Sequence, residues 1–252
     1  MTILVTGGTG TLGRPTVALL RAAGYPVRIL SRIPGDGRAV GDLRSGAGLA
    51  AALEGVETVL HLATSANSTD VAQARALMAA ASTAGVTHLV FISIVGVDVV
   101  PYSYYRAKLA VERVIEQSGV PFTILRATQF HSFLAMIPRS QRRMPVILSL
   151  NLPDQPIAVE EVAARLVELV AAGPSGYVAD IGGPEQLTVR DAIDIWQRAA
   201  GTHKPVWTLH LGGKTMRALQ AGHHMPGLPG YGTGTFAEYA AAEASSTRSS
   251  RS

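Results

Sequence analysis

The chain has 252 residues, 47% of them hydrophobic, so it is large and apolar enough for one α/β domain with a small appendage and is not a disordered protein. It contains no cysteine, which excludes disulfides, thiolate metal sites and cysteine nucleophiles. A modest net charge of +4, dispersed basic residues and only 6% aromatic residues argue against a nucleic-acid-binding surface.

A glycine-rich turn stands near the start of the chain. The apolar run 3–5 predicts a buried strand, and the turn connects it to a helical pattern of apolar residues. The glycines fit G-x-G-x-x-G from Gly8 and G-x-x-G-x-x-G from Gly7, and both patterns share Gly10 and Gly13. Such a turn lets a pyrophosphate approach main-chain amides at the positive end of a helix. A tight strand-to-helix turn alone would also explain the glycines, but their position directly after a strand predicts dinucleotide binding.

The end of the second expected strand, 26–30, bears on the choice of cofactor. A carboxylate there would bind the ribose 2′-hydroxyl of NAD and repel a 2′-phosphate. The sequence instead has Arg32, with Arg14 near the start of the first helix, and a guanidinium donates two parallel hydrogen bonds to a phosphate. Arg32 therefore predicts NADP. The alternatives are a solvated surface arginine, or NAD, which the nearby Asp36 keeps open.

Strands and helices then alternate at βαβ spacing. After the short helical stretch 49–53, the expected elements are 58–62, 71–84, 89–92, 103–118 and 121–126. This alternation predicts an α/β fold, a Rossmann-type doubly wound parallel sheet with helices on both faces. Ligands bind at the carboxyl ends of such strands. The polar residues expected on that rim are Ser31, His61, Thr64, Ser93 and Arg126.

Three residues form a candidate catalytic set. Tyr104 and Lys108 are four apart and share one face of the expected helix 103–118, and Ser93 ends the preceding strand. An ammonium beside a phenol stabilises phenolate, so we expect Lys108 to lower the pKa of Tyr104. Tyr104 would protonate a carbonyl oxygen that Ser93 polarises, while Lys108 also holds the nicotinamide ribose. An ordinary amphipathic helix is the alternative, and Tyr105 projects about 100° away from Tyr104.

The regular alternation weakens after residue 129. We interpret 1–127 as the NAD(P)-binding core and 128–240 as a small C-terminal substrate cap integrated with it. The cap has expected strands at 155–159 and 177–181 and helices at 160–172 and 188–200, the last with Thr188 as N-cap. The low-complexity end, 241–252, is expected to be disordered.

Several of these motifs occur together in one known family. Residues 6–13, 41–43 and 123–130, the strand end at Ser93, and the Tyr104 to Lys108 segment resemble the atypical short-chain dehydrogenases, in particular the NmrA-like NAD(P)H-binding group. The resemblance implies that the glycine loop binds the pyrophosphate and that the 41–43 turn lies by the adenine. It also implies that the strand end 61–64 and the loop after residue 126 flank the nicotinamide. The residues expected to bind the cofactor are Gly7, Thr9, Gly10, Leu12, Gly13, Arg32, Asp42, Leu43, Ala63, Thr64, Lys108 and Thr128.

We therefore expect an NADPH-dependent oxidoreductase that reduces a small apolar carbonyl or quinone-like substrate by hydride transfer, with Tyr104, Lys108 and Ser93 as its catalytic residues. The resemblance also implies a rival, a non-catalytic NADP(H)-binding, redox-sensing regulator of the NmrA type. A nucleotide-sugar epimerase would need a larger substrate domain than the cap. His131 is a weaker alternative proton donor, because a lone histidine is more often packed or solvated.

The expected partners and location follow from absences. His223-His224 has no nearby carboxylates, so no metal site is expected. The longest apolar stretch, 89–100, is too short to span a membrane, and a strand expected from residue 2 leaves no room for a signal peptide. We expect a cytoplasmic monomer or homodimer with a small-molecule substrate and neither a nucleic-acid nor a membrane partner.

Overall fold

The structure is a computed structural model that describes residues 1–249. The chain divides into two compact units. The first contains residues 1–98, 102–126 and 162–179, and the second contains 99–101, 127–161 and the residues from 180 onward. The segment 162–179, which the sequence interpretation placed in the cap, thus belongs to the first unit.

The first unit is built on a seven-stranded parallel sheet of order β3-β2-β1-β4-β5-β6-β9. Its strands are β1 (Ile3–Thr6), β2 (Val27–Ser31), β3 (Arg38–Val40), β4 (Thr58–His61), β5 (His88–Ile94), β6 (Phe122–Ala127) and β9 (Gly176–Tyr177). Strand order runs outward in opposite directions from β1 and β4, which makes this pair the switch point of a doubly wound sheet. The predicted Rossmann-type α/β fold is confirmed.

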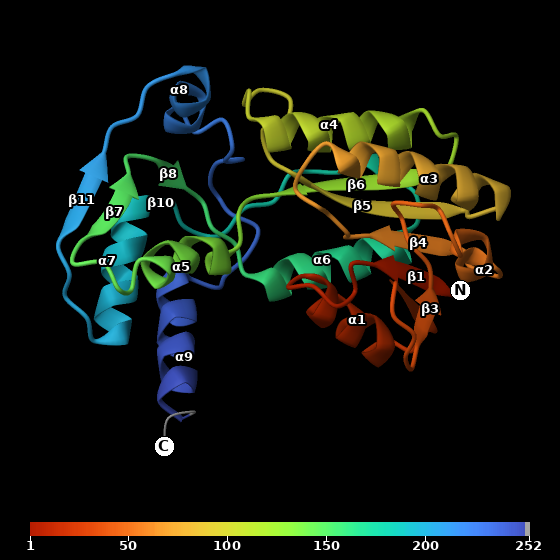
Figure 1. The fold of residues 1–252 in the computed structure, drawn as a ribbon, viewed down its shortest axis with the longest axis horizontal. Coiled ribbons are helices and arrows are strands. Elements are labelled where there is room, and N and C mark those ends of the chain that lie inside the picture. The colour runs from red at the N-terminus through yellow and green to blue at the C-terminus, as the bar shows by residue number, and fades with distance from the viewer. Residues whose placement is uncertain (250–252) are drawn as a thin grey trace. The chain divides into compact units, whose positions relative to one another are not determined.

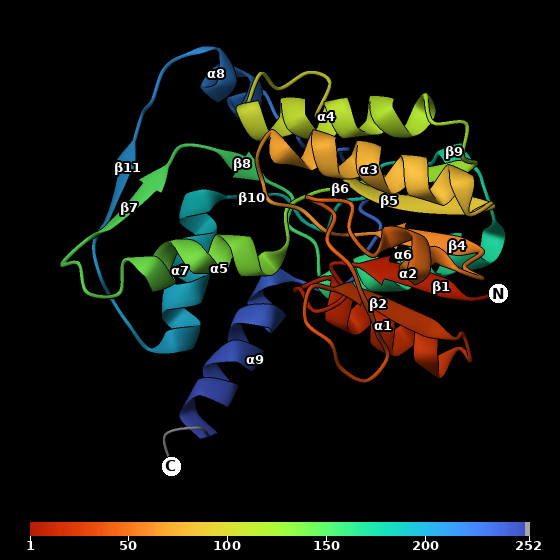
Figure 2. The same cartoon turned by 45° about the vertical axis from the view of Figure 1, so that its right-hand side comes forward.

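Helices cover both faces of this sheet. They are α1 (Gly13–Ala22), α2 (Leu49–Leu53), α3 (Thr69–Thr83), α4 (Ser103–Glu116) and α6 (Val159–Ala172). Helices α3 and α4 lie side by side on one face, with α1 and α6 on the other (Figures 1 and 2). Strands β1 and β4 are buried along their whole length because both faces are covered. The core on the α3 side includes Leu4, Leu53, Leu77, Phe91 and Ile115.

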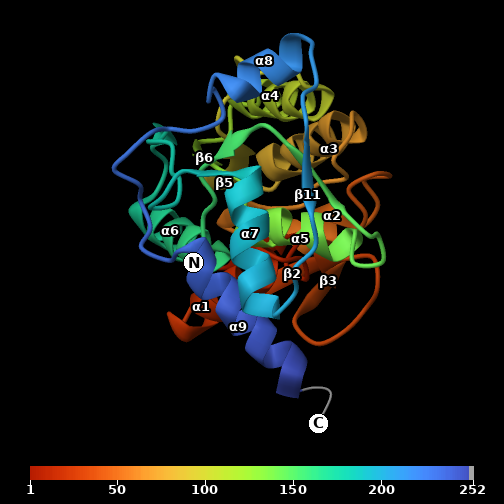
Figure 3. The same cartoon turned by 90° about the vertical axis from the view of Figure 1, so that its left-hand side faces the viewer.

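The second unit combines short strands with helices. Its helices are α5 (His131–Ser140), α7 (Val189–Ala200), α8 (Lys214–Gln220) and α9 (Phe236–Ser249). Its two-stranded sheets pair β7 (Ile147–Leu150) with β11 (Val206–Leu209) in parallel, and β8 (Pro153–Asp154) with β10 (Leu187–Thr188) antiparallel. Helices α5, α7 and α9 pack together around Leu134, Ala192 and Phe236 (Figure 3). Within residues 1–249, no helix is long and apolar enough to cross a membrane.

The start of α7 and the end of α9 can be compared with the sequence predictions. Thr188 caps α7 as predicted, because its hydroxyl accepts from the Asp191 amide at 3.1 Å while the Asp191 carboxylate accepts from the Thr188 amide at 3.0 Å. Helix α9 continues to Ser249, into the stretch from 241 that we expected to be disordered. Alanines are good helix formers and account for this extension. The rest of the predicted tail, 250–252, lies outside the described residues.

A buried ion pair ties together distant parts of the first unit. Arg126 at the end of β6 donates from Nε to Glu112 Oε1 at 3.0 Å and from Nη2 to Oε2 at 2.7 Å. The Glu112 side chain on α4 is fully buried, and it also accepts from the Tyr177 hydroxyl on β9 at 3.2 Å. The remaining arm of Arg126 donates to Asp98 at 3.0 Å. Arg126 lies at the expected rim, but its guanidinium is occupied by these structural contacts.

Replacing Arg126 with alanine is expected to destabilise the protein by about 3–5 kcal/mol, because the buried Glu112 carboxylate loses its compensating charge. Urea unfolding followed by circular dichroism measures the change. The exposed Arg165–Glu168 pair provides a matched control, since Glu168→Ala should cost less than about 1 kcal/mol. Equal losses in the two variants would contradict a special role for the buried pair.

Candidate functional site

The glycine loop between β1 and α1 is shaped by close backbone approaches. Gly7 has a φ of +71°, and a Cβ there would lie 2.7 Å from the Ala63 amide nitrogen. A Cβ on Gly13 would overlap the Gly7 carbonyl oxygen. The loop is closed by a 3.0 Å hydrogen bond from the Gly10 amide to that same oxygen. The glycines are therefore needed to pack the loop against the segment after β4 and to start α1 directly behind it.

The start of α1 has the features of an anion site. No side chain caps it and its first turn carries no acidic residue, so its positive dipole end is left for a ligand, although the Arg14 amide already donates to the Gly10 carbonyl oxygen at 3.0 Å. Thr9 and Gly10 are exposed at the tip of the loop, while Leu12 is buried and anchors the helix start. A loop without side chains at its closest approaches, followed by an uncapped helix, fits a bound pyrophosphate.

Arg32 lies at the same edge of the sheet as the glycine loop. Strands β1 and β2 run parallel with Thr6 opposite Leu30, so the residues that follow each strand are neighbours. Arg32 is exposed, and the exposed Arg14 donates from Nε to the Thr9 carbonyl oxygen at 2.8 Å. Both guanidinium groups are thus available beside the loop, as an arginine that reads a 2′-phosphate requires.

The turn after β3 is held by its own carboxylate. Asp42 accepts from the Arg44 amide at 2.9 Å and from the Ser45 hydroxyl at 3.4 Å, while Leu43 is buried in the core of the first unit. This geometry makes Asp42 an organiser of its turn. Its predicted contact with the adenine stays a prediction.

The end of β4 carries a buried histidine. His61 Nδ1 lies 2.7 Å from Thr6 Oγ1, and the imidazole stacks on Phe91 with ring centroids 5.5 Å apart. Burial, and next the positive charge of Lys108, lower the pKa of His61 to about 3, so the ring is neutral. Thr6 Oγ1 also accepts from the Ala63 amide at 3.2 Å. His61 is therefore a packed residue that links β1 to the segment flanking the glycine loop.

The turn that follows, residues 64–66, is held by a residue absent from the predicted set. Asp70, at the start of α3, accepts from the Thr64 hydroxyl and from the Ser65 amide, each at 2.6 Å. Asp70 is 6% exposed, which is unusual for a carboxylate. Asp70 directly precedes the expected helix 71–84, and the sequence gave no sign of its role in this turn, because its partners are brought to it by the tertiary fold.

The predicted catalytic residues lie at the end of β5 and on α4. The register of β4 and β5 pairs His61 with Phe91, which brings Ser93 level with Ala63. Ser93 is 2% exposed, and its hydroxyl has no hydrogen-bond partner among the described residues. Buried hydroxyls normally have a partner, so an unpaired one beside the glycine loop marks a place where a ligand atom can be bound.

Lys108 is directed into this end of the sheet. Its ammonium donates to the Ile92 carbonyl oxygen at 3.1 Å and lies 4.7 Å from the centre of the Phe91 ring. Burial lowers the pKa of Lys108 to about 8, against the opposing effect of the Asp70 and Glu112 carboxylates. At neutral pH the side chain is therefore mainly an ammonium.

The predicted effect of Lys108 on Tyr104 is wrong. Burial of the phenol raises the pKa of Tyr104, the Thr64 side chain opposes this, and the charges of Asp70 and Tyr102 add to the increase. Desolvation outweighs the expected help from Lys108, whose ammonium is turned toward Ile92. Tyr104 is thus a phenol that keeps its proton at neutral pH.

Two candidates belong to the second unit. Thr128 donates from its hydroxyl to the Gln155 carbonyl oxygen at 2.6 Å, and its amide donates to Ile181 at 3.0 Å. Its contact with the cofactor stays a prediction. His131 is buried, lies 3.2 Å from the Pro156 carbonyl oxygen and packs edge-on against Phe236. This matches the packed histidine that we weighed against a proton donor.

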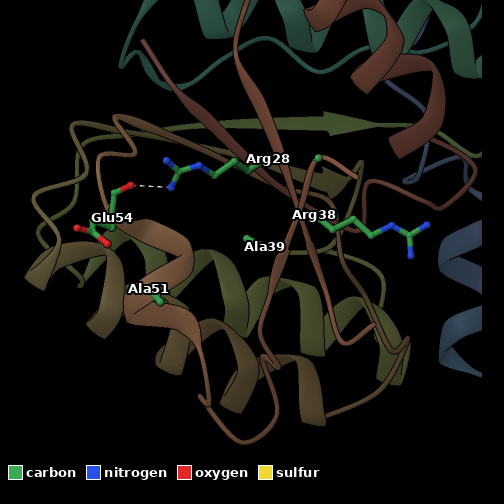
Figure 4. A pocket seen from close by; sticks show the side chains of 6 residues that line it. Arg28, Arg38, Ala39, Ala51 and Glu54 are labelled. Carbon is green, nitrogen blue, oxygen red and sulfur yellow. Dashed lines mark hydrogen bonds between the residues drawn. The ribbon is translucent and has the colours of Figure 1, made fainter. Parts of the chain in front are cut away.

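A separate surface pocket of about 410 Å³ lies in the first unit beside β2, β3 and α2. Its lining residues are Arg28, Gly37, Arg38, Ala39, Ala51 and Glu54. Arg28 donates to the Glu54 carbonyl oxygen at 2.6 Å, and the Arg28 and Arg38 side chains point in opposite directions (Figure 4). None of the predicted cofactor-binding residues lines this pocket.

Comparison with known proteins shows which family this chain belongs to. A family model described as NAD(P)H-binding matches residues 7–172. The (4-alkanoyl-5-oxo-2,5-dihydrofuran-3-yl)methyl phosphate reductase of Streptomyces griseus is 32% identical over 213 residues, which cover 79% of this chain and 74% of that protein. The NAD(P)H azoreductase of Xenophilus azovorans is 28% identical over 240 residues, covering 89% and 82%.

Among solved structures, the NADPH-dependent quinone oxidoreductase of Escherichia coli complexed with NADPH superposes with a TM-score of 0.82. The match covers 96% of this chain and 99% of that one at 20% identity. At this identity the match supports a common fold and not a common function. The family model spans well over half of the chain and includes the glycine loop, the turn after β4 and the Tyr104 helix. The chain therefore belongs to the NAD(P)H-binding family, as its resemblance to the NmrA-like short-chain dehydrogenases predicted, and this membership confirms NAD(P)H as its cofactor.

Proposed function

We propose that the protein is an NADPH-dependent reductase of a small, fairly apolar carbonyl or quinone-like compound. The observation that carries this proposal is the unpaired buried hydroxyl of Ser93, level with the Ala63 that packs against Gly7, and it is supported by a Tyr104 phenol that keeps its proton. The relatives named above are reductases, which favours turnover. Because these relatives act on different compounds, the proposed substrate class is argued from the residues of the site.

NADPH, when bound, supplies the hydride. Ser93 donates a hydrogen bond to the substrate oxygen and so polarises the carbonyl group. Tyr104 donates its proton to that oxygen as negative charge develops there, which a phenol that stays protonated at neutral pH is suited to do. Lys108 keeps one ammonium proton on Ile92 and has others to hold the nicotinamide ribose.

A cofactor-binding regulator without turnover is the second candidate. The observation that favours it is the position of Lys108, which does not activate Tyr104 in the way that the sequence suggested. Purified protein mixed with NADPH and a panel of ketones and quinones separates the two candidates. Oxidation of NADPH with an acceptor supports the reductase, whereas tight NADPH binding without consumption supports the regulator.

Tyr104→Phe is expected to lower kcat/KM for ketone reduction by about 10²-fold or more, because the substrate oxygen loses its proton donor. The dissociation constant for NADPH should stay within about twofold, since the phenol is not needed to bind the cofactor. Loss of NADPH absorbance gives the rate and fluorescence titration gives the affinity. Tyr25→Phe, on the loop after α1, is the control and should behave as wild type. Undiminished ketone reduction by Tyr104→Phe would remove this residue from the mechanism.

Arg32→Ala is expected to weaken NADP binding by about 10- to 100-fold, the loss of a charge-assisted hydrogen bond, while NAD affinity stays nearly unchanged. Calorimetric titration of both cofactors measures the difference. Arg38→Ala removes an exposed arginine from the neighbouring strand and serves as the control for the loss of one positive charge. Equal affinity of the wild-type protein for NADP and NAD would refute the proposed preference.

A further inference from the structure

One face of the two-stranded β7–β11 sheet in the second unit is apolar and open to solvent. In the register of these parallel strands, Trp207 lies beside Leu148 and Leu209 lies beside Leu150, and the strands run side by side (Figures 1 and 2). Side chains alternate between the two faces of a strand, so these four side chains share one face, which we call the outer face. Trp207 is 61% exposed and Leu209 40% exposed, whereas Leu148 and Leu150 are partly buried.

The opposite face of the same strands already makes the packing contacts of this sheet. Ile147 is buried with Val189 and Ile193 of α7, and Val206 packs against them. A sheet that buries one face ordinarily carries polar residues on the other. The outer face instead carries tryptophan and leucines that this core does not use, and an exposed apolar surface of this kind is typical of an interaction site.

A group of basic residues borders the outer face. The segments that lead into β7 and β11 enter the parallel pair together, and Lys204 joins them by donating from Nζ to the carbonyl oxygen of Arg142 and, at 2.9 Å, to that of Met144. The side chains of Arg142 and Arg143 are exposed. We call Arg142, Arg143 and Lys204 the basic rim, and its position at the start of both strands is fixed by these hydrogen bonds.

The charge of the basic rim is not offset by the chain on either side of it. Neither the segment 139–152 nor the segment 195–211 contains an aspartate or a glutamate. On the neighbouring helix α7, Asp194 lies 3.8 Å from Arg190 and is therefore paired. The outer face and its rim thus combine exposed apolar side chains with uncompensated positive charge.

We propose that the outer face of β7 and β11, with the basic rim beside it, docks onto an anionic lipid surface. Trp207 and Leu209 enter the boundary between headgroups and acyl chains, and the arginines of the rim bind lipid phosphates. Tryptophan suits this boundary because its ring is apolar and its N–H can donate to a polar group. The expectation that the protein has no membrane partner rested on the lack of a spanning stretch, and docking at the surface needs none.

Charge and composition favour a lipid surface over two other occupants. In a symmetric dimer of this chain the same surface meets itself, so one basic rim would lie close to another and the like charges would repel. A nucleic acid would bind the arginines, but it is usually held by several stacking aromatic side chains as well. Trp207 is the single aromatic residue among the four of the outer face.

The inference goes beyond the proposed reductase and does not depend on it. For a reductase of quinone-like compounds, docking brings the protein to the phase in which apolar compounds dissolve. Each measurement below reports binding alone, so a protein that reduces no acceptor refutes the proposed function and leaves the docking to be decided by its own tests.

Sedimentation with lipid vesicles tests the docking. The wild type is expected to bind vesicles of phosphatidylglycerol mixed with phosphatidylcholine, and not vesicles of phosphatidylcholine alone, at about 0.1 M salt. The double variant Arg142→Glu, Arg143→Glu is expected to lower the partition coefficient by at least about tenfold, because the rim then repels the lipid. The matched control, Arg75→Glu with Arg113→Glu, makes the same change of net charge on exposed residues of α3 and α4. It should stay within about twofold of the wild type, because distant charges are screened.

Either of two results in this experiment would overturn the proposal. Failure of the wild type to prefer the anionic vesicles would mean that the basic rim does not bind lipid phosphates. Equal weakening in the two double variants would show that the net charge of the protein, and not this surface, governs the binding.

Fluorescence locates the contact on the molecule. The chain has two tryptophans, and Trp196→Phe leaves Trp207 as the single reporter while it keeps an aromatic ring beside Arg139, whose guanidinium lies 4.6 Å from the Trp196 ring centre. Anionic vesicles are expected to shift the Trp207 emission to shorter wavelength, and lipids with brominated acyl chains are expected to quench it. If vesicles sediment the protein but leave this emission unchanged, the outer face does not make the contact and the proposal is wrong.

Two further measurements identify the other occupants. Analytical ultracentrifugation of a wild-type dimer that Trp207→Ser converts to a monomer would make the outer face an interface between copies of the chain, against the proposal. Tighter binding to a duplex DNA oligonucleotide than to the anionic vesicles, lost in the Arg142→Glu, Arg143→Glu variant, would also overturn it. The expected result is a wild type whose oligomeric state does not change in Trp207→Ser and which binds the vesicles in preference to DNA.

Discussion

The close approach of Gly7 to Ala63 is the constraint on which the rest of the proposed site depends. These residues follow neighbouring strands, β1 and β4, and the Thr6 hydroxyl joins them by accepting from the Ala63 amide. With no side chain at Gly7, two loops that would otherwise be separated share a backbone contact. Ser93 reaches the same level through the register of β4 and β5. The loop proposed to bind the pyrophosphate and the residues proposed for proton transfer thus lie at one edge of the sheet.

Burial, more than any single neighbour, decides the protonation states at this edge. It makes His61 neutral, brings the pKa of Lys108 to about 8 and keeps the Tyr104 phenol protonated. The charge of Asp70 partly offsets the effect of desolvation on the pKa values of His61 and Lys108, and adds to it for the Tyr104 phenol. Desolvation disfavours every charged form, whereas a carboxylate favours cations and disfavours a second anion. Burial therefore keeps the proton on the Tyr104 phenol while it disfavours the charged forms of His61 and Lys108.

The doubly wound parallel sheet could be predicted from the sequence because buried parallel strands are continuous apolar runs that alternate with helical patterns. Helix α5 escaped prediction because Pro138 lies inside it, and β3 and β11 because short, partly exposed strands lack a clear pattern. The spacing of Tyr104 and Lys108 correctly gave them one helix. The spacing carried no information about how deeply each side chain is buried. Lys108 is buried, and its ammonium donates to the Ile92 carbonyl oxygen. Asp70 could not be singled out, since its partners are created by folding.

The discontinuity of the first unit has a consequence for how the chain acquires its structure. Strand β9 and most of α6 come from residues 162–179, which follow a long excursion into the second unit. Until they are synthesised, the edge of β6 has no neighbour on that side, and Glu112 lacks the Tyr177 hydroxyl that accompanies Arg126. A fragment that stops at residue 126 contains every proposed catalytic side chain, yet it leaves the β6 edge of its sheet unpaired and the face shared by α1 and α6 only partly covered. The first unit is therefore completed only by residues that follow part of the second unit in the sequence.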